Sequence, residues 1–600
     1  MTNLQEWHHH LRSAVHPTLF AACYKLTDVV CKTLSCDTSS RASLLLAAPK
    51  ALQAAIAAYG DYYTYKIARH VYGSDSSATS LALFFTVSSP WNWFCSTRMF
   101  SNCLETTLTA VALYHWPYHW ALGVDEHGYQ VDEKVLRIRE TDEQVVDETT
   151  HLRRAILAAS LATVLRPTNV IIWLTLMLST FGRGIWMHGM QWEMTALIRE
   201  GASCSSLVLI CSALIDRLYY KTWTFPAWNF LRFNVFQSIA VFYGNNNWHY
   251  YLSQGYPLLL LVLLIPASIG LFEAIVSTGS AFSKLSTQSR LVVHRLALVS
   301  LVLPAVMSIL SHKEIRFFYP ILPALHVIAV APAKWLLGWN SKTTTRGLWS
   351  GFRLLPYVSK FCVIGTLALH TGIGYYLSIE HNSGLIRATD YLRHEFETKY
   401  LTTAHRSDDC NMTIAFLMPC HSTPWRSHLQ YPPSTETPGI SGWALTCEPP
   451  LGLTATEKET YLDEADIFYS DPQLWIETNM ATKAPDPSPS SQQQQRHHQP
   501  ESTVSHYDPD VPPLKSTPRS AYTQTSIWLE QGGHSSISTS PTLQTRNWPA
   551  YLLFFAQLEP QVSHILRRRG YVECTRFWNS AWHDDWRRRG DVVVWCLTPR

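Results

Sequence analysis

Four ionisable side chains follow one another between two apolar stretches of the sequence. They are His312, Lys313, Glu314 and Arg316. The apolar run 291–310 precedes them, and a second apolar run, 317–330, follows at once. Cations in such a place can hold phosphate oxygens, and a carboxylate beside them can pair with them or exchange protons. The cluster therefore predicts a site for a phosphate-bearing substrate, with an interfacial loop facing lipid headgroups as the alternative.

The helices that would position this cluster follow from a longer apolar pattern. The chain is 47% hydrophobic and 16% charged. The best segment, 256–276, has Glu273 as its only charge and is near the ~20 residues needed to cross a bilayer. We expect spans at 42–59, 79–95, 104–119, 155–182, 203–220, 256–276, 291–310, 317–338 and 355–378. Interruptions at Lys50 and at Arg166-Pro167 are typical of helices that surround an internal site.

The rest of the chain has the pattern of a small α/β domain. Buried strands are predicted at 412–418, 551–555, 571–577 and 591–596. Between the second and third strands, Val562, Ile565 and Leu566 recur at helical spacing. We therefore predict a polytopic α-helical membrane unit over 1–380 and an α/β domain over 381–600. Residues 481–545, rich in Ser, Pro, Gln and Thr, are predicted to be a flexible insertion in that domain.

Charge and cysteine usage exclude two classes of site. The net charge is +3 and the basic residues are dispersed, so nothing indicates a nucleic-acid surface. The 13 cysteines show no zinc spacing. Cys410, Cys420 and Cys447 cluster after the last apolar segment, where a lumenal disulfide of open pairing is expected. The sequon Asn411-Met412-Thr413 is compatible with the same lumenal side.

Seven further residues are candidates for substrate binding. They are Asp61, Arg98, Asn102, Glu105, Trp248, His249 and His421. Asp61 could line a cavity or simply end a helix. The spacings of four and three from Arg98 to Glu105 predict one polar helix face. Trp248 and His249 belong to a polar, aromatic loop suited to sugar contact or to a membrane interface. His421 follows a predicted strand, where ligand-facing and structural histidines both occur.

The pattern His-Lys-Glu-x-Arg-Phe between hydrophobic helices resembles the signature of the dolichol-phosphate-mannose-dependent α-mannosyltransferases of the endoplasmic reticulum, glycosyltransferase family 22. Other pieces that resemble this family are Leu11-Arg12-Ser13, Ala48-Pro49-Lys50, Gly60-Asp61, 97–107, 242–244 and 248–251. The resemblance implies a GT-C-like membrane fold. It covers nearly all of residues 5–600.

The C-terminal pieces resemble one branch of that family, the GPI mannosyltransferase 3 or PIG-B type. These pieces are 417–424, 463–469 and 579–586. The resemblance implies transfer of the third mannose from dolichyl-phosphate-mannose to a GPI precursor, through an α1,2 bond with inversion. It also implies a multi-pass protein of the endoplasmic reticulum membrane with a lumenal active site. The expected partners are the lipid-linked donor, the precursor glycolipid and the membrane, with no cofactor and no metal.

On this resemblance, Lys313 and Arg316 would bind the donor phosphate, and His312 and Glu314 would complete the polar network. The family's catalytic base is an acidic pair in its first lumenal loop. The match begins after that loop, near Trp7, so we expect the chain to lack it. The alternatives are an enzyme for a neighbouring step, such as the fourth GPI mannose or the N-glycan precursor, and a truncated or non-catalytic membrane homologue.

Overall fold

The computed structural model describes residues 10–74, 76–122, 142–188, 191–232, 246–276, 281–339, 352–353, 355–401, 411–431, 438–447, 461–481 and 546–598. The chain divides into two compact units, Met1–Ile379 and Glu380–Arg600. Residues 482–545 of the predicted insertion, Cys410 and the piece 242–244 lie outside the described residues.

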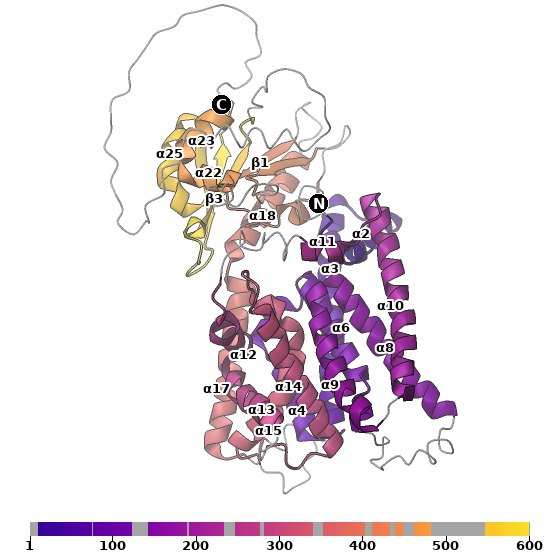
Figure 1. The fold of residues 1–600 in the computed structure, drawn as a ribbon. Coiled ribbons are helices and arrows are strands. Elements are labelled where there is room, and N and C mark those ends of the chain that lie inside the picture. Colours follow the sequence, from indigo (N-terminus) through magenta and orange to yellow (C-terminus); the bar gives the residue numbers. More distant parts are fainter. Residues whose placement is uncertain are drawn as a thin grey trace, which may run out of the picture. The chain divides into compact units, whose positions relative to one another are not determined.

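The N-terminal unit is a bundle of helices (Figure 1). In chain order, its described α-helices are α2 (Val15–Thr33), α3 (Thr38–Tyr72), α4 (Ser77–Val87), α5 (Pro90–Cys95), α6 (Ser101–His115), α8 (Asp142–Leu165), α9 (Val170–His188), α10 (Gln191–Tyr220), α11 (Pro226–Leu231), α12 (Tyr256–Leu260), α13 (Leu264–Val276), α14 (Thr287–Met307), α15 (Leu322–Leu336) and α17 (Tyr357–Tyr375). Side chains cap several helix starts: Asp37 accepts from the backbone NH of Ser40 before α3, and Ser286 does the same for Ser289 before α14.

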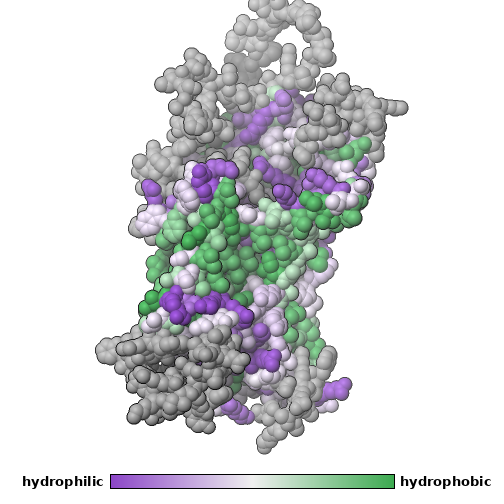
Figure 2. Space-filling model, turned by 90° about the vertical axis from the view of Figure 1, so that its right-hand side faces the viewer, coloured by the Kyte–Doolittle hydropathy of each residue, from purple (hydrophilic) through white to green (hydrophobic). Residues whose placement is uncertain are grey.

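Among the described residues, six helices are long and apolar enough to cross a membrane. They are Thr38–Tyr72, Met194–Tyr220, Tyr251–Val276, Thr287–Met307, Tyr319–Leu336 and Tyr357–Tyr400. Exposed apolar side chains gather in a band across one face, with hydrophilic residues beside it (Figure 2). The protein is therefore a polytopic helical membrane protein, as predicted.

Two predicted interruptions have different outcomes. Helix α8 ends at Leu165 and the 3-10 turn η2 (Pro167–Asn169) follows, so the break at Arg166-Pro167 is confirmed. The break near Lys50 is wrong, because α3 continues through Pro49 to Tyr72. Neighbouring helices in a membrane bundle can satisfy the backbone carbonyl that a proline leaves without its NH partner.

Among the six described candidate spans, the one that contains α15 is the most buried. Val327, Ile328 and Val330 have no exposed surface, and the hydroxyl of Tyr72 on α3 donates to the carbonyl of Val327 at 2.8 Å. The predicted span 317–338 thus lies mostly inside the protein. This burial fixes the position of the ionisable cluster that directly precedes the helix.

The C-terminal unit contains a five-stranded sheet in the order β2-β1-β3-β5-β4. The strands are β1 (Met412–Phe416), β2 (Ile440–Ala444), β3 (Tyr551–Phe555), β4 (Tyr571–Phe577) and β5 (Val592–Leu597). β1 pairs in parallel with β2 and β3, and β5 runs antiparallel to β3 and β4. The four predicted strands are confirmed. β2 is additional, because Ile-Ser-Gly-Trp-Ala has no run of apolar residues that would predict it.

Helices and disulfides complete this unit. The described α-helices are α18 (Ser383–Glu395), α20 (Trp425–His428), α22 (Glu464–Ser470), α23 (Pro472–Asn479) and α25 (Glu559–Arg568), and α25 confirms the predicted helix. One disulfide joins Cys420 to Cys447, as expected for that cluster, and a second joins Cys574 to Cys596. The second was not predicted, because cross-strand neighbours become visible only once β4 and β5 are paired.

Candidate functional site

The ionisable cluster lies in the short connection between α14 and α15. α14 ends at Met307, and the 3-10 turns η7 (Ile315–Phe317) and η8 (Tyr319–Ile321) lead into α15. Pro320 and Pro323 occupy the start of this next helical stretch, where a missing backbone NH costs no hydrogen bond. The four ionisable residues therefore lie in a short connection, Arg316 in its 3-10 turn η7, directly before the buried helix α15.

Glu314 is the centre of the cluster. Its Oε1 accepts hydrogen bonds from His312 Nε2 at 2.9 Å and from an Arg316 guanidinium nitrogen at 2.8 Å. Arg316 Nε forms an ion pair with Oε2, so the arginine engages both carboxylate oxygens. Burial alone would raise the pKa of Glu314, but the hydrogen bonds from His312 and Arg316 outweigh burial and lower the pKa to about 2. Glu314 is thus ionised at neutral pH and is a poor proton acceptor.

Lys313 points away from this pair and is only 4% exposed. Its ammonium donates to the backbone carbonyls of Asn246 at 2.9 Å and Leu310 at 2.5 Å. Asn246 returns two hydrogen bonds, from its side chain to the carbonyl of Lys313 and from its backbone NH to the carbonyl of Ser311, both 3.0 Å. Burial lowers the pKa of Lys313. The observed contacts of Lys313 and Asn246 hold the connection in shape.

Asn102 and Glu105 on α6 support the cluster from the other side. Asn102 donates to the backbone carbonyl of Arg316 at 3.0 Å and to Glu105 Oε2 at 3.3 Å. The other Glu105 oxygen accepts from Asn169 at 2.9 Å, and Asn169 in turn accepts from the indole NH of Trp173 at 2.7 Å. Asn102, Glu105 and Asn169 are at most 2% exposed. Their contacts show a buried network that positions the backbone of Arg316.

Arg98 does not share this helix face, contrary to the prediction. α6 begins at Ser101, and Arg98 lies in the preceding turn, where its Nε donates to the carbonyl of Phe94 at 2.6 Å. Its guanidinium lies over the ring of Phe94, and the residue is exposed. The spacing argument assumed that the helix includes Arg98, three residues before its first residue, Ser101.

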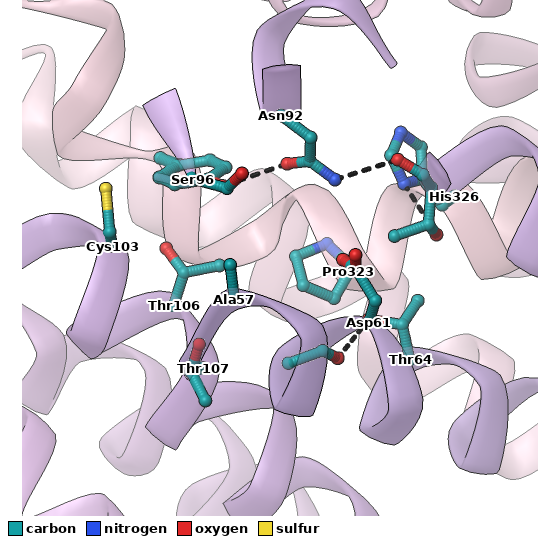
Figure 3. A pocket seen from close by; sticks show the side chains of 13 residues that line it. Ala57, Asp61, Thr64, Asn92, Ser96, Cys103, Thr106, Thr107, Pro323 and His326 are labelled. Atoms are coloured by element: carbon teal, nitrogen blue, oxygen red, sulfur yellow. Dashed lines mark hydrogen bonds between the residues drawn. The ribbon is translucent and has the colours of Figure 1, made fainter. Parts of the chain in front are cut away.

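Asp61 lines a separate, small pocket inside the helical bundle (Figure 3). Asp61, Thr106 and Thr107 line one side, and Asn92 and His326 lie opposite. Asn92 accepts from the hydroxyl of Tyr319 at 2.9 Å and donates to the carbonyl of Thr86 at 3.0 Å. The structure thus places Asp61 in a polar cavity, one of the two roles left open by the sequence.

Three other predicted residues lie outside the network around Glu314. Trp248 is 71% exposed, and His249 Nδ1 lies 3.0 Å from the hydroxyl of Ser253. His421 belongs to the C-terminal unit, where it follows β1 with a positive φ of 60° and is exposed. Their roles in substrate binding stay predictions.

The acidic and basic motif residues of the C-terminal unit pair with one another. Arg587 bridges Asp466 at 2.6 Å and Asp585 at 3.0 Å, and Arg588 donates to the carbonyl of Cys420 at 2.8 Å. These contacts join the loop after β1, the first turn of α22 and the segment before β5. The pieces 417–424, 463–469 and 579–586 therefore gather at one place in the unit.

Arg166, which in the sequence marks only an interruption of a span, lies beside the cluster. Its guanidinium carbon is 5.1 Å from the centre of the Phe317 ring, and that of Arg316 is 6.0 Å from the same ring. Arg166 is 6% exposed. A charged residue directly before Pro167, inside an apolar run, is the sequence signal that could have identified Arg166 as a site residue.

The described charges of the site come from arginine, histidine and glutamate side chains. The described residues contain no group of three His, Cys, Asp or Glu side chains that could hold a metal ion. Arg316, His312 and the ionised Glu314 instead form a fixed electrostatic arrangement at the end of buried helices. Such an arrangement can stabilise charge that develops on a phosphate or a sugar oxygen.

Comparisons with known proteins identify the family. The model of the "Alg9-like mannosyltransferase family" matches residues 2–430. Three relatives named "GPI mannosyltransferase 3" are similar over almost the whole chain. The Aspergillus fumigatus protein is 41% identical over 99% of this chain and 71% of its own length, the Emericella nidulans protein 36% over 99% and 71%, and the Gibberella zeae protein 34% over 98% and 86%.

A vertebrate protein and a solved structure are more distant. The "GPI alpha-1,2-mannosyltransferase 3" of Danio rerio is 31% identical over 80% of this chain and 73% of its own. The crystal structure of ArnT from Cupriavidus metallidurans bound to undecaprenyl phosphate has a TM-score of 0.45 at 10% identity, covering 98% of this chain and 88% of that chain. On the family model and the relatives above 30% identity, this chain belongs to the Alg9-like mannosyltransferase family.

Proposed function

We propose that the protein transfers mannose from dolichyl-phosphate-mannose to the second mannose of a GPI-anchor precursor, forming an α1,2 bond with inversion. The product carries the third mannose of the anchor. The names of the relatives at 34–41% identity support this step over the fourth-mannose or N-glycan alternatives. The observation that carries the proposal in the structure is the Glu314 cluster, fixed by Asn102 and Asn246 at the end of membrane helices.

In this reaction, the acceptor hydroxyl oxygen attacks the anomeric carbon of the donor as the bond from that carbon to the phosphate oxygen breaks. The acceptor proton goes to a base, and dolichyl phosphate leaves with the negative charge. Glu314 is not that base, since its pKa of about 2 keeps it ionised and weakly basic. It holds Arg316 and His312 in place, and these groups stabilise the charge of the reacting oxygens.

We place the C-terminal unit in the lumen of the endoplasmic reticulum. Disulfides persist in oxidising compartments and are rare in the cytosol, and the described residues of this unit form two of them, Cys420–Cys447 and Cys574–Cys596. The sequon at Asn411 belongs to the same unit and is exposed. In this proposal, the mannose of the lipid-linked donor is transferred on the lumenal side of the membrane.

The test uses microsomes from cells that lack the third GPI mannosyltransferase and contain this protein. Labelled dolichyl-phosphate-mannose is supplied with the two-mannose precursor. We expect one labelled mannose to be added and then released by an α1,2-specific mannosidase, with the rate greatly reduced in Glu314→Gln. Glu273→Gln is the matched control, because Glu273 accepts from the backbone NH of Ala281 and is not part of the cluster. Label that resists the α1,2-specific enzyme, or no label with well-expressed protein, would contradict the proposal.

A further inference from the structure

Asp61 carries a carboxylate within a candidate membrane span, the helix α3. The residue is half-buried and lines the small pocket of Figure 3, whose other walls come from α4, α5, α6 and the start of α15. Among the described residues, none donates a hydrogen bond to this carboxylate and none forms a salt bridge with it. A carboxylate inside a membrane protein is costly unless a cation or hydrogen-bond donors compensate its charge. The described groups therefore leave the negative charge of ionised Asp61 uncompensated.

The threonine hydroxyls of the pocket have already used their hydrogens. Three of them donate to backbone carbonyls: Thr64 to Gly60 at 3.0 Å, Thr106 to Asn102 at 2.8 Å, and Thr107 to Ile56 at 3.1 Å. A hydroxyl group has one hydrogen and two lone pairs. These threonine oxygens can therefore act toward the pocket only as acceptors or as ligands of a cation.

The opposite wall has the same character. The hydroxyl of Tyr319 donates to Asn92 Oδ1 at 2.9 Å, and the amide of Asn92 donates to the carbonyl of Thr86 at 3.0 Å. The hydroxyl of Thr86 donates to the carbonyl of Ala82 at 2.9 Å and lies 3.1 Å from His326 Nδ1. Because the hydrogen of Thr86 is used, Nδ1 of His326 must carry the hydrogen of that contact, and Nε2 of the neutral ring is an acceptor. Oxygen and nitrogen lone pairs thus dominate this wall.

The space in the pocket is small. It has room for about one water molecule, so a sugar or a lipid phosphate does not fit. Among the other lining residues, Cys103 donates its thiol hydrogen to the carbonyl of Cys95. A carboxylate that faces acceptors across so small a space matches a single small cation.

We infer that this pocket binds a sodium ion, with the Asp61 carboxylate as the charged ligand and the oxygens of Thr64, Thr106 and Asn92 as neutral ligands. Hard cations take oxygen ligands of these kinds, and cavity size and ligand number decide between them. One carboxylate balances one positive charge, whereas a divalent ion would leave an excess charge inside the bundle. A water molecule would donate hydrogen bonds to Asp61 but leave its charge in place. The ion would join α3 to α6, and it should therefore stabilise the fold.

The experiment measures sodium binding to the full chain, purified in detergent micelles. The buffer is N-methylglucamine chloride at about pH 8, where a free carboxyl group is ionised. Sodium chloride replaces the organic salt at constant ionic strength, and the melting temperature is followed. We expect a rise that saturates with sodium concentration, and a smaller rise with potassium, whose ion is larger.

Asp61→Asn should abolish this rise. Without sodium, the variant should melt at the same temperature as the unchanged protein or higher, because the amide keeps the shape and removes an uncompensated charge. A carboxylate with a merely structural role would instead give a variant that melts lower in every salt. Asp390→Asn is the matched control, since Asp390 is an exposed carboxylate on α18, and it should keep the rise.

Two results would overturn the inference. Equal melting temperatures of the unchanged protein in sodium and N-methylglucamine chloride would mean that a proton or water, and not sodium, accompanies Asp61. A rise that persists in folded Asp61→Asn would place the sodium effect elsewhere.

If Asp61→Asn does not fold, Thr64→Val carries the same test. It removes one oxygen ligand at nearly constant volume, so the sodium concentration for half of the rise should increase several-fold. Thr163→Val is its control, because Thr163 on α8 makes the same type of bond, to the carbonyl of Ala159 at 2.9 Å, outside the pocket. Equal sodium dependence of the Thr64 and Thr163 variants would contradict the site. No mannose transfer is measured, so these outcomes are independent of the proposed function.

Discussion

The side-chain amide of Asn102 donates to the backbone carbonyl of Arg316 at 3.0 Å, joining residues 214 positions apart. Arg316 is thereby held at its backbone by Asn102 and at its guanidinium by Glu314. Asn102 itself is 2% exposed and bound to Glu105, so the support is buried. The position of Arg316 thus depends on a helix far away in the sequence.

Removing the hydrogen bond from Asn102 to the carbonyl of Arg316 should reduce the turnover number more than it weakens substrate binding. Asn102→Ala leaves the carbonyl of Arg316 and one oxygen of Glu105 without their donor, a cost of about 1–3 kcal/mol for a buried group. We expect kcat for mannose transfer to fall about ten-fold, with KM for the donor changed less. Asn229→Ala is the control, since Asn229 bonds to the carbonyl of His10 instead. A purely structural role would lower the amount of folded protein and leave kcat of the remainder unchanged.

The charge of Glu314 should make stability depend on pH in a defined window. Its pKa is lowered from 4.5 to about 2 in the folded protein, so the ionised form stabilises the fold above pH 4.5. This contribution is lost as the pH falls from about 4.5 to about 2, and is at most about 3 kcal/mol. The difference in melting temperature between the unchanged protein and Glu314→Gln should be constant from pH 6 to 8 and shrink by pH 3. A difference that persists at pH 3 would refute the assigned role of the charge.

Gly270 on α13 should tolerate no side chain. A Cβ at this position would lie 2.8 Å from the backbone carbonyl oxygen of Ile328 and 2.7 Å from its side chain, so α13 and α15 would have to separate. Close approach of helix backbones at small residues is common in membrane proteins. We expect Gly270→Ala to destabilise the protein by about 1–3 kcal/mol. The measurement is the melting temperature of Gly270→Ala, which should be lower than that of the unchanged protein.

The control for this prediction is Gly201→Ala on α10. No atom lies within 4 Å of a Cβ built there, so the change should be neutral or slightly stabilising, as alanine favours the helix. Equal effects of the two substitutions would mean that α13 and α15 do not pack as described.

The disulfide Cys420–Cys447 should stabilise the C-terminal unit. The two cysteines are 27 positions apart, and closing a loop of that length contributes about 3–4 kcal/mol through the unfolded chain. The double change of Cys420 and Cys447 to Ser should therefore make this unit unfold at lower temperature and be cleaved faster by protease. Cys211→Ser, at an exposed free cysteine, should have no effect. Unchanged protease resistance after loss of the disulfide would contradict this account.

Asn411 should carry an N-linked glycan if the C-terminal unit is lumenal. Its Oδ1 accepts from the backbone NH of Gly439 at 2.9 Å, which leaves the amide nitrogen, the atom that a glycan uses, on an exposed residue. Treatment with an endoglycosidase should shift the protein on a gel, and Asn411→Gln should remove that shift. Thr413→Ser keeps the sequon and should keep the shift. No shift in the unchanged protein would argue against glycosylation of this residue.

The sequence by itself determined six of the nine expected membrane spans, four of the five described C-terminal strands and the place of the cluster at 312–316. These features are local: apolar length, alternation and charge next to an apolar run are properties of neighbouring residues. For the same reason, α25 was predictable from Val562, Ile565 and Leu566 alone. The family was also recognisable, since its motifs are short stretches of consecutive residues.

Tertiary structure alone decided which of these side chains act together. Asn169 and Asn246 reach Glu105 and Lys313 only after helices far apart in sequence pack. Arg98 does not lie on the helix face predicted for it, because α6 begins only at Ser101. Arg166 could not be distinguished from a helix break until its burial and its place against Phe317 were known. Hydrogen bonds and burial depend on which distant segments pack against one another, and spacing along the chain does not specify that packing.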